Sequence, residues 1–133
     1  MTKREEYEHL LKRSREFYET AIFQLEKGFY GLAAFSLEQA LQLFLKAKML
    51  ERGVDYPRIH SVRRLLELLS EVVEKEFSRV LRELVEKYSL ELASIEDAYI
   101  TSRYIPREFR RGEVLRLKRV VDEVVDVVSR ITG

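Results

Sequence analysis

The apolar residues between Gly31 and Arg52 follow helical spacing and cover an unusually broad arc. On a helical wheel centred on Ala40, this arc is roughly twice the ~100° stripe of an ordinary surface helix. Its members are Phe29, Leu32, Ala33, Leu37, Leu41, Leu43, Phe44, Ala47 and Leu50. The narrow polar remainder holds Glu38, Gln39, Gln42 and Lys46, interrupted by Phe35 and Met49. A helix that is apolar on most sides must contact several neighbours, so the pattern predicts the central helix of a bundle.

The first helix is expected over residues 3–27. Its apolar seam alternates in steps of four and three, as in a coiled coil, through Tyr7, Leu11, Ser14, Tyr18, Ala21 and Leu25. Gly28 should end this helix, because glycine adopts the left-handed conformation that a helix end requires. The short link over residues 28–31 then predicts an antiparallel helical hairpin. Within the second helix, alanines at seven-residue spacing would let a neighbour approach closely.

The segment 54–60 reads as a loop, because Pro57 disfavours helical geometry at the residue before it. Ser61 is the expected N-cap of a third helix, and the apolar period continues to Tyr88 with a break expected within residues 70–75. Beyond it, Ser94 and Asp97 form a variant of the capping box, which predicts a helix opening at Ser94.

This further helix should end at Pro106, and a final helix is expected over residues 112–130. That last segment is rich in valine, which favours strands, but its three-four spacing is helical. Together the segments predict an all-α fold, an up-and-down antiparallel bundle of about five helices. We expect residues 1–133 to form a single domain.

Composition removes several classes of function. The chain has no cysteine, which excludes disulfides and thiol nucleophiles. Its only histidines, His9 and His60, lack metal-binding spacing, and no glycine-rich phosphate loop is present, so we expect no metal and no bound cofactor. The charged N-terminus and short apolar runs predict a cytoplasmic protein without a membrane span.

Two basic clusters remain as candidate chemistry in a chain of net charge +1. The first comprises Arg58, His60, Arg63 and Arg64 around the expected start of the third helix, where the helix dipole already favours an anion. The second has a local charge of +5 and interleaved aromatic residues, a composition suited to phosphates and bases. Its cations are Arg103, Arg107, Arg110, Arg111, Arg116, Lys118 and Arg119. Ion pairs on the surface of a charged bundle are the plainer interpretation.

Three runs of the sequence, AAFSLEQALQLFLKAKMLERG, HSVRRLLELL and IEDAYITSRYIPREF, resemble a HEPN domain (higher eukaryotes and prokaryotes nucleotide-binding). The resemblance covers nearly the whole chain in order. It implies a helical bundle that is commonly a homodimer. In prokaryotes it also implies frequent pairing with a minimal nucleotidyltransferase, often as a toxin–antitoxin pair.

The resemblance also implies an activity, because many HEPN proteins are metal-independent ribonucleases that use an Arg-x4-6-His motif between the penultimate helix and the start of the last. Arg103 matches the arginine, but Glu108, Phe109 and Arg110 stand where the histidine is expected. Arg4 and His9 fit the spacing in the wrong part of the chain. Arginine stays protonated near neutral pH and cannot shuttle a proton as histidine does.

The leading hypothesis is therefore a non-catalytic module that binds a nucleotide or RNA phosphate, forms a homodimer and partners a minimal nucleotidyltransferase. Its expected ligand-binding residues are Arg103, Tyr104, Arg107, Arg110, Arg111, His60, Arg63 and Arg64. One alternative is a metal-independent ribonuclease that uses Arg103 with His60 as a non-standard base. Another is a purely structural interaction protein. An exposed apolar patch that includes Phe35, Met49, Tyr99 and Tyr104 is expected to support dimerisation.

Overall fold

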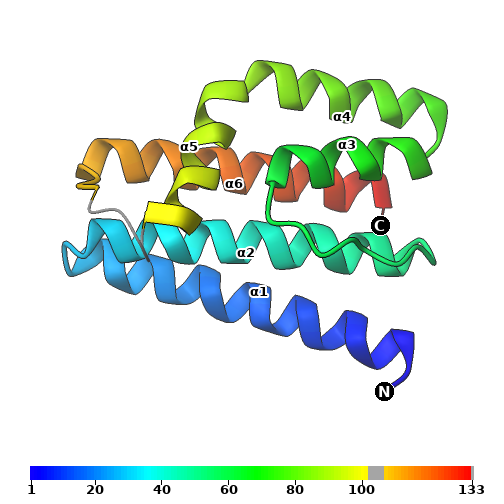
Figure 1. The fold of residues 1–133 in the computed structure, drawn as a ribbon, viewed down its shortest axis with the longest axis horizontal. Helices are drawn as coiled ribbons and strands as arrows, with labels where there is room; N and C mark the ends of the chain where they lie inside the picture. The colour runs from blue at the N-terminus through cyan, green and yellow to red at the C-terminus, as the bar shows by residue number, and fades with distance from the viewer. Residues whose placement is uncertain (102–106, 133) are drawn as a thin grey trace.

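The computed structural model describes residues 1–101 and 107–132, and its helices form a bundle (Figure 1). They are α1 (Lys3–Glu26), α2 (Tyr30–Glu51), α3 (Val62–Val72), α4 (Lys75–Lys87), α5 (Ser89–Thr101) and α6 (Arg111–Thr132). No strand occurs in these ranges. The predicted all-α bundle is confirmed, with six helices in the described residues.

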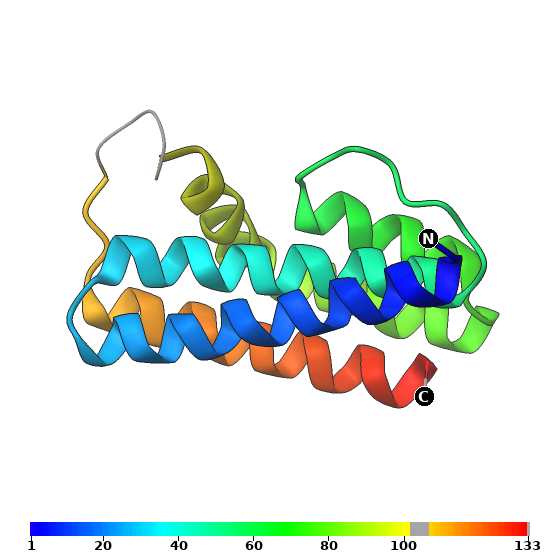
Figure 2. The same ribbon diagram turned by 90° about the horizontal axis from the view of Figure 1, so that it is seen from below.

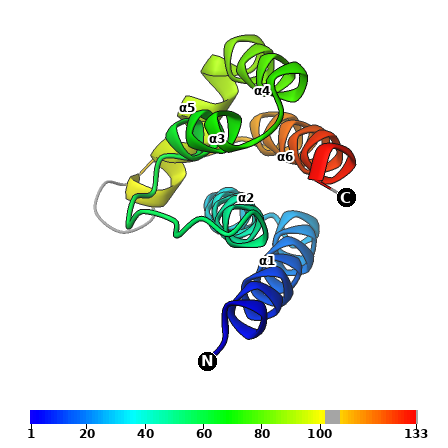
Figure 3. The same cartoon turned by 90° about the vertical axis from the view of Figure 1, so that its right-hand side faces the viewer.

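The second helix, α2, is the centre of the bundle, as its broad apolar arc predicts. It packs against α1, α3, α5 and α6. Seen end-on, it lies between α1 on one side and the later helices on the other (Figure 3). Ala33, Ala40 and Ala47 are at most 2% exposed, so small side chains do stand where neighbours come close. The hydroxyl of Ser14 on α1 donates to the Ala40 carbonyl at 2.6 Å.

The hairpin of α1 and α2 is antiparallel, and Figure 2 shows the two helices side by side. Gly28 adopts a φ of +79° at the turn. Gly53 follows α2 with a φ of +76°. Side chains disfavour both conformations, so glycine is the residue that lets each helix end abruptly.

The middle of the chain confirms one predicted cap and the predicted break. The Ser61 hydroxyl accepts from the Arg64 N–H at 3.1 Å and caps α3. The break between α3 and α4 falls at residues 73–74. α3 and α4 form a second hairpin, and α5 then crosses the bundle steeply to reach α2 (Figure 1).

Ser94 does not open a helix, contrary to the sequence prediction. α5 begins at Ser89 and Ser94 lies in its middle. The reason is that the apolar face starts earlier, at Leu92, and continues through Ile95 and Ala98, all of which are fully buried. The predicted stop at Pro106 lies outside the described residues.

Met49 also departs from the prediction, because it belongs to the core and not to a surface patch. Its side chain is 2% exposed and packs in the main hydrophobic cluster. Phe35 is half-buried and stacks against Tyr99, with ring centroids 6.4 Å apart. The polar side of α2 is thus largely covered by other segments of the chain, with Phe35 and Gln39 half-buried.

Tyrosine hydroxyls tie α1 to the rest of the bundle. Tyr7 on α1 donates to Glu51 at the end of α2 at 2.8 Å. Tyr56, in the segment before α3, donates to Glu6 at 2.9 Å. Burial is the main cause that raises the pKa of Tyr7 to about 12, and the hydrogen bond to the Glu51 carboxylate adds to it.

Leu41 should be among the residues most sensitive to truncation, because it is fully buried in α2 at the centre of the bundle. We expect Leu41→Ala to lower the free energy of unfolding by about 2–5 kcal/mol, since it removes buried methyl groups and leaves a cavity. Urea denaturation followed by circular dichroism measures this. Leu90→Ala is the matched control, because Leu90 is 82% exposed; equal losses in both variants would contradict the assignment.

The Tyr7 hydrogen bond should make stability depend on pH in the alkaline range. The tyrosine pKa is raised from 10.0 to about 12 in the folded state, so its stabilising contribution is complete below about pH 10 and is lost as the pH rises through about 12. We expect the gap in unfolding free energy between wild type and Tyr7→Phe, about 1 kcal/mol near neutral pH, to shrink over that window. A gap that stays constant across the same urea titrations would refute this.

Candidate functional site

A row of polar side chains runs along the buried side of α2. Glu38, Gln42 and Lys46 are four residues apart, one turn each, and are at most 8% exposed. The Gln42 amide donates to Glu38 at 2.6 Å, and the Lys46 ammonium donates to the Gln42 carbonyl at 2.9 Å. The Gln39 amide donates to Glu38 at 2.6 Å as well. The glutamine therefore bridges a buried carboxylate and a buried ammonium.

Lys46 is a buried titratable group in this row. Burial lowers the pKa of its ammonium, and the Glu38 carboxylate acts in the opposite direction. Its Nζ also lies 5.4 Å from the centre of the Tyr56 ring, which is a favourable cation–π distance. The opposite charges of Lys46 and Glu38 make each tolerable in an otherwise apolar helix.

His60 joins this row to α5. Its Nδ1 lies 3.3 Å from the Gln42 carbonyl oxygen, and its Nε2 lies 3.1 Å from the Tyr99 hydroxyl. The amide oxygen can only accept, so Nδ1 carries a proton, and in a neutral ring Nε2 accepts from Tyr99. The His60 and Tyr99 rings also stack with centroids 4.2 Å apart. Since His60 immediately precedes the Ser61 cap, the start of α3 fixes its position.

The predicted anion site at the start of α3 already holds a carboxylate of the protein. Glu96 on α5 accepts from the Ser61 hydroxyl at 3.1 Å and from Arg63 at 2.8 and 3.2 Å. This hydrogen-bonded pairing raises the pKa of the Arg63 guanidinium. The neighbouring Arg64 side chain is exposed. Of these two predicted ligand-binding arginines, one is thus paired within the fold and one faces solvent.

Arg107, from the second basic cluster, also contacts polar side chains of α5. Its guanidinium lies 3.5 Å from Asp97 and 3.7 Å from Glu113, and it donates to the Ser94 hydroxyl at 3.4 Å. It also stacks over the buried Phe109 ring at 4.2 Å. Such packing identifies Arg107 as a structural link between α5 and the segment ahead of α6.

The remaining predicted residues differ in their surroundings. The Arg110 side chain is exposed, while its backbone N–H donates to Glu113 at 2.8 Å and so caps α6. Arg111 is exposed and lines a hollow between α1 and α6. Arg103 and Tyr104 lie outside the described residues. Helix α5 is thus the common partner of both basic clusters, and Arg111 stands apart from it.

Sequence reasoning missed the buried row on α2 and the carboxylate of Glu96. The helical wheel places Glu38, Gln42 and Lys46 on the narrow polar side of the helix, but it does not predict that they are buried. The signal that could have identified the row is its regular spacing of four on a helix that is apolar elsewhere, since such a stripe can hydrogen bond to itself.

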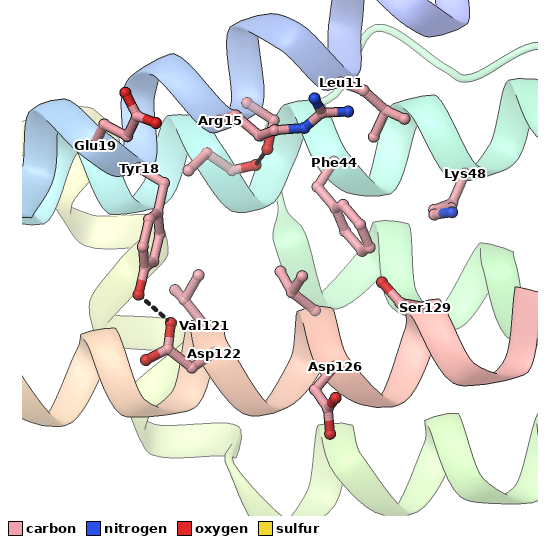
Figure 4. A pocket seen from close by; sticks show the side chains of 13 residues that line it. Leu11, Arg15, Tyr18, Glu19, Phe44, Lys48, Val121, Asp122, Asp126 and Ser129 are labelled. Carbon is pink, nitrogen blue, oxygen red and sulfur yellow. Dashed lines mark hydrogen bonds between the residues drawn. The ribbon is translucent and has the colours of Figure 1, made fainter. Parts of the chain in front are cut away.

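A cavity of about 560 Å³ opens between α1, α2 and α6 (Figure 4). Its floor is mainly apolar, with Ala40 and Phe44 from α2 and Val121 from α6. The Tyr18 hydroxyl closes one end by donating to Asp122 at 2.5 Å. None of the site residues predicted from the sequence lines this cavity, so it is separate from the row on α2.

The part of the chain that the structure describes contains no group of three His, Asp or Glu side chains arranged to hold a metal ion. Nor does any helix in it have the length and apolar character needed to cross a membrane. At the meeting point of α2, α3 and α5, the structure gathers His60, Arg63 and Tyr99.

Fold and site together define an all-α bundle domain with hydrogen-bonding side chains gathered around its central helix. The family model of the HEPN domain matches residues 7–131, and the chain belongs to this family. No curated protein sequence matches the chain. Membership makes the protein a nucleotide- or RNA-related module.

The Gln42 bridge should contribute measurably to stability. Gln42→Met keeps the side-chain volume but leaves Glu38 and Lys46 without their common partner, so we expect the free energy of unfolding to fall by about 1–3 kcal/mol. Gln39→Met is the control, because Gln39 is only half-buried and has a smaller share of the network. Urea denaturation of both variants measures the difference, and a Gln42→Met loss no greater than that of the control would contradict this role.

Proposed function

We propose that the protein is a non-catalytic HEPN module that binds a nucleotide or RNA phosphate. In this proposal it acts in the cytoplasm as a homodimer and as the partner of a minimal nucleotidyltransferase of the toxin–antitoxin type. Arg103, Tyr104, Arg110 and Arg64 are the residues assigned to phosphate and base contacts.

One observation carries the binding proposal: both basic clusters meet on α5. His60 and Arg63 contact Tyr99 and Glu96, and Arg107 contacts Asp97 on the same helix. His60 and Arg107, 47 positions apart in the sequence, therefore both contact α5. A surface that joins exposed cations to aromatic rings suits the phosphate and base of a nucleotide.

The absence of catalysis is proposed from the chemistry of the available groups. Both ring nitrogens of His60 are within hydrogen-bonding distance of Gln42 or Tyr99, so the ring serves as a link between helices. Arg107 is held by carboxylates. Neither side chain is arranged as a general base, which would need a proton-accepting nitrogen directed at a bound hydroxyl.

A ribonuclease that pairs Arg103 with His60 is the second candidate. The observation in its favour is that His60 contacts Tyr99, which precedes Arg103 by four residues in the sequence. In that mechanism the Nε2 of His60 would take the proton of the 2′-hydroxyl and the arginine would stabilise the phosphate.

A purely structural role is the third candidate, and two ion pairs favour it. Arg63 with Glu96 and Arg107 with Asp97 are the kind of partners expected on the surface of a charged bundle. For this candidate, neither nucleotides nor RNA should bind in a salt-sensitive manner.

The homodimer has separate support in the exposed apolar residues at the start of α2. Phe29 and Leu32 lie one turn apart and are 52% and 54% exposed. Two large apolar side chains next to each other in solvent are a common feature of protein–protein contacts. The nucleotidyltransferase partnership is proposed from family membership alone.

RNA binding should weaken when the exposed cations are removed. We expect Arg64→Gln with Arg110→Gln to lower the affinity for a labelled single-stranded RNA about tenfold and to reduce the slope of log K against log salt by about 1 to 1.5, because fewer counterions are released. Fluorescence anisotropy over a salt series measures both quantities. Arg79→Gln is the matched control, since Arg79 is an exposed arginine on α4.

The same RNA, incubated with wild type and analysed on a denaturing gel, tests catalysis. Intact RNA is the expected result. Cleavage that disappears in both Arg103→Ala and His60→Ala would establish the ribonuclease in place of our proposal, and salt-insensitive or undetectable binding would favour the structural role.

A further inference from the structure

A basic hollow lies between the end of α1 and the start of α6, on the far side of α2 from His60. Its volume is about 550 Å³, within the ~300–1,000 Å³ of typical small-ligand sites. Three cations line it: Lys27 from the turn after α1, and Arg111 and Lys118 from α6. One carboxylate, Glu26, is also present, so the lining carries a net positive charge.

The cations of this hollow remain available to an anion to different degrees. Arg111 and Lys27 have no carboxylate partner in the described part of the chain, and Lys27 lies 5.5 Å from the Phe23 ring. Lys118 donates to Asp122 at 3.0 Å, and this hydrogen bond raises the pKa of its ammonium. Since Arg111 is the first residue of a 22-residue helix, the positive end of its dipole adds to the field of these cations.

The floor of the hollow is apolar and includes one aromatic ring. Leu25 from α1 and Leu115 from α6 line it together with Tyr30, the first residue of α2. The Tyr30 side chain is half-buried, and its hydroxyl makes no hydrogen bond to any described residue. Gly28 lies beside it, and a Cβ there would come within 3.9 Å of that hydroxyl. The hollow thus combines a flat ring, an unused hydroxyl and three cations.

We infer that this hollow binds a phosphate-bearing nucleotide, either free or as a terminal nucleotide of RNA. The base would lie against Tyr30 and the leucines, and the phosphate would meet Arg111, Lys27 and Lys118. Stacking on an aromatic ring and charge neutralisation are the two contributions that dominate such binding. The inference rests on the proposed nucleotide-binding function but assigns it a site away from α5.

The hollow lies apart from the surface around α5 where His60, Arg63 and Arg107 contact that helix. On α2, Ala40 and Phe44 face α1 and α6. Each lies two positions along the chain from Glu38 or Gln42. Because two positions correspond to about half a turn, the two pairs lie on opposite sides of the helix. The hollow also shares no lining residue with the apolar cavity of Figure 4. Substitutions in one region can therefore be tested without altering the other.

Titration calorimetry with adenosine 5′-monophosphate tests the assignment, with Arg111→Glu and Lys27→Glu as the variants. We expect each variant to weaken binding about tenfold or more, because a cation becomes an anion beside the phosphate. Arg79→Glu on α4 is the charge-matched control and should stay within about twofold of wild type. Urea denaturation of every variant checks that the fold is retained, and Tyr30→Ala should weaken the mononucleotide while leaving ribose 5-phosphate unchanged.

Parallel arms separate the possible outcomes. In one outcome the mononucleotide never binds, but a single-stranded RNA binds to wild type and loses affinity in Arg111→Glu. This result identifies an RNA end as the source of the phosphate. Ribose 5-phosphate that binds as tightly as the mononucleotide overturns the base contact and with it the inference. Nucleotide binding that survives in Arg111→Glu but fails in the Arg64→Gln, Arg110→Gln variant overturns the hollow and leaves the proposed function standing. If neither the mononucleotide nor the RNA binds to wild type, both are overturned.

Discussion

Glu38, Gln42 and Lys46 are polar side chains in the most enclosed helix of the protein, and their hydrogen bonds to one another make that burial possible. An isolated carboxylate or ammonium in such surroundings would cost several kcal/mol, whereas here one amide serves both. Among the described residues, every buried side-chain nitrogen and oxygen has a hydrogen-bond partner. The bundle can therefore close over all sides of α2, and His60 and α5 are positioned because they complete this network.

Helix α5 connects that core to the surface where function is proposed. Its buried face packs on α2, while Glu96, Asp97 and Tyr99 hold the start of α3 and the segment ahead of α6. Distant basic segments thus depend on one short helix for their relative position. The HEPN family membership gives this arrangement its nucleotide-related context, and the basic hollow adds a second place where charge and an aromatic ring coincide.

Periodicity in the sequence was sufficient to predict the all-α class, the central position of α2, the hairpin at Gly28 and the Ser61 cap. These features depend on local spacing and on which residues avoid water, both of which can be read along the chain. The pairing of Arg63 with Glu96 could not be predicted in this way, because it depends on how α5 crosses the bundle. The prediction of a helix that opens at Ser94 was wrong for a related reason. The apolar face of α5 begins at Leu92, and its burial determines where the helix runs, whatever the local capping motif favours.

The carboxylate of Glu96 at the start of α3 has a consequence for any ligand that approaches there. It already accepts hydrogen bonds from the Ser61 hydroxyl and the Arg63 guanidinium. A carboxylate of the protein itself therefore competes with a ligand for the start of α3. A phosphate that pairs with Arg63 must displace this side chain, which breaks the polar contact that α5 makes with the start of α3. Binding at Arg63 therefore exchanges one anion for another, and a monoanion that resembles a carboxylate has no advantage over the group already in place.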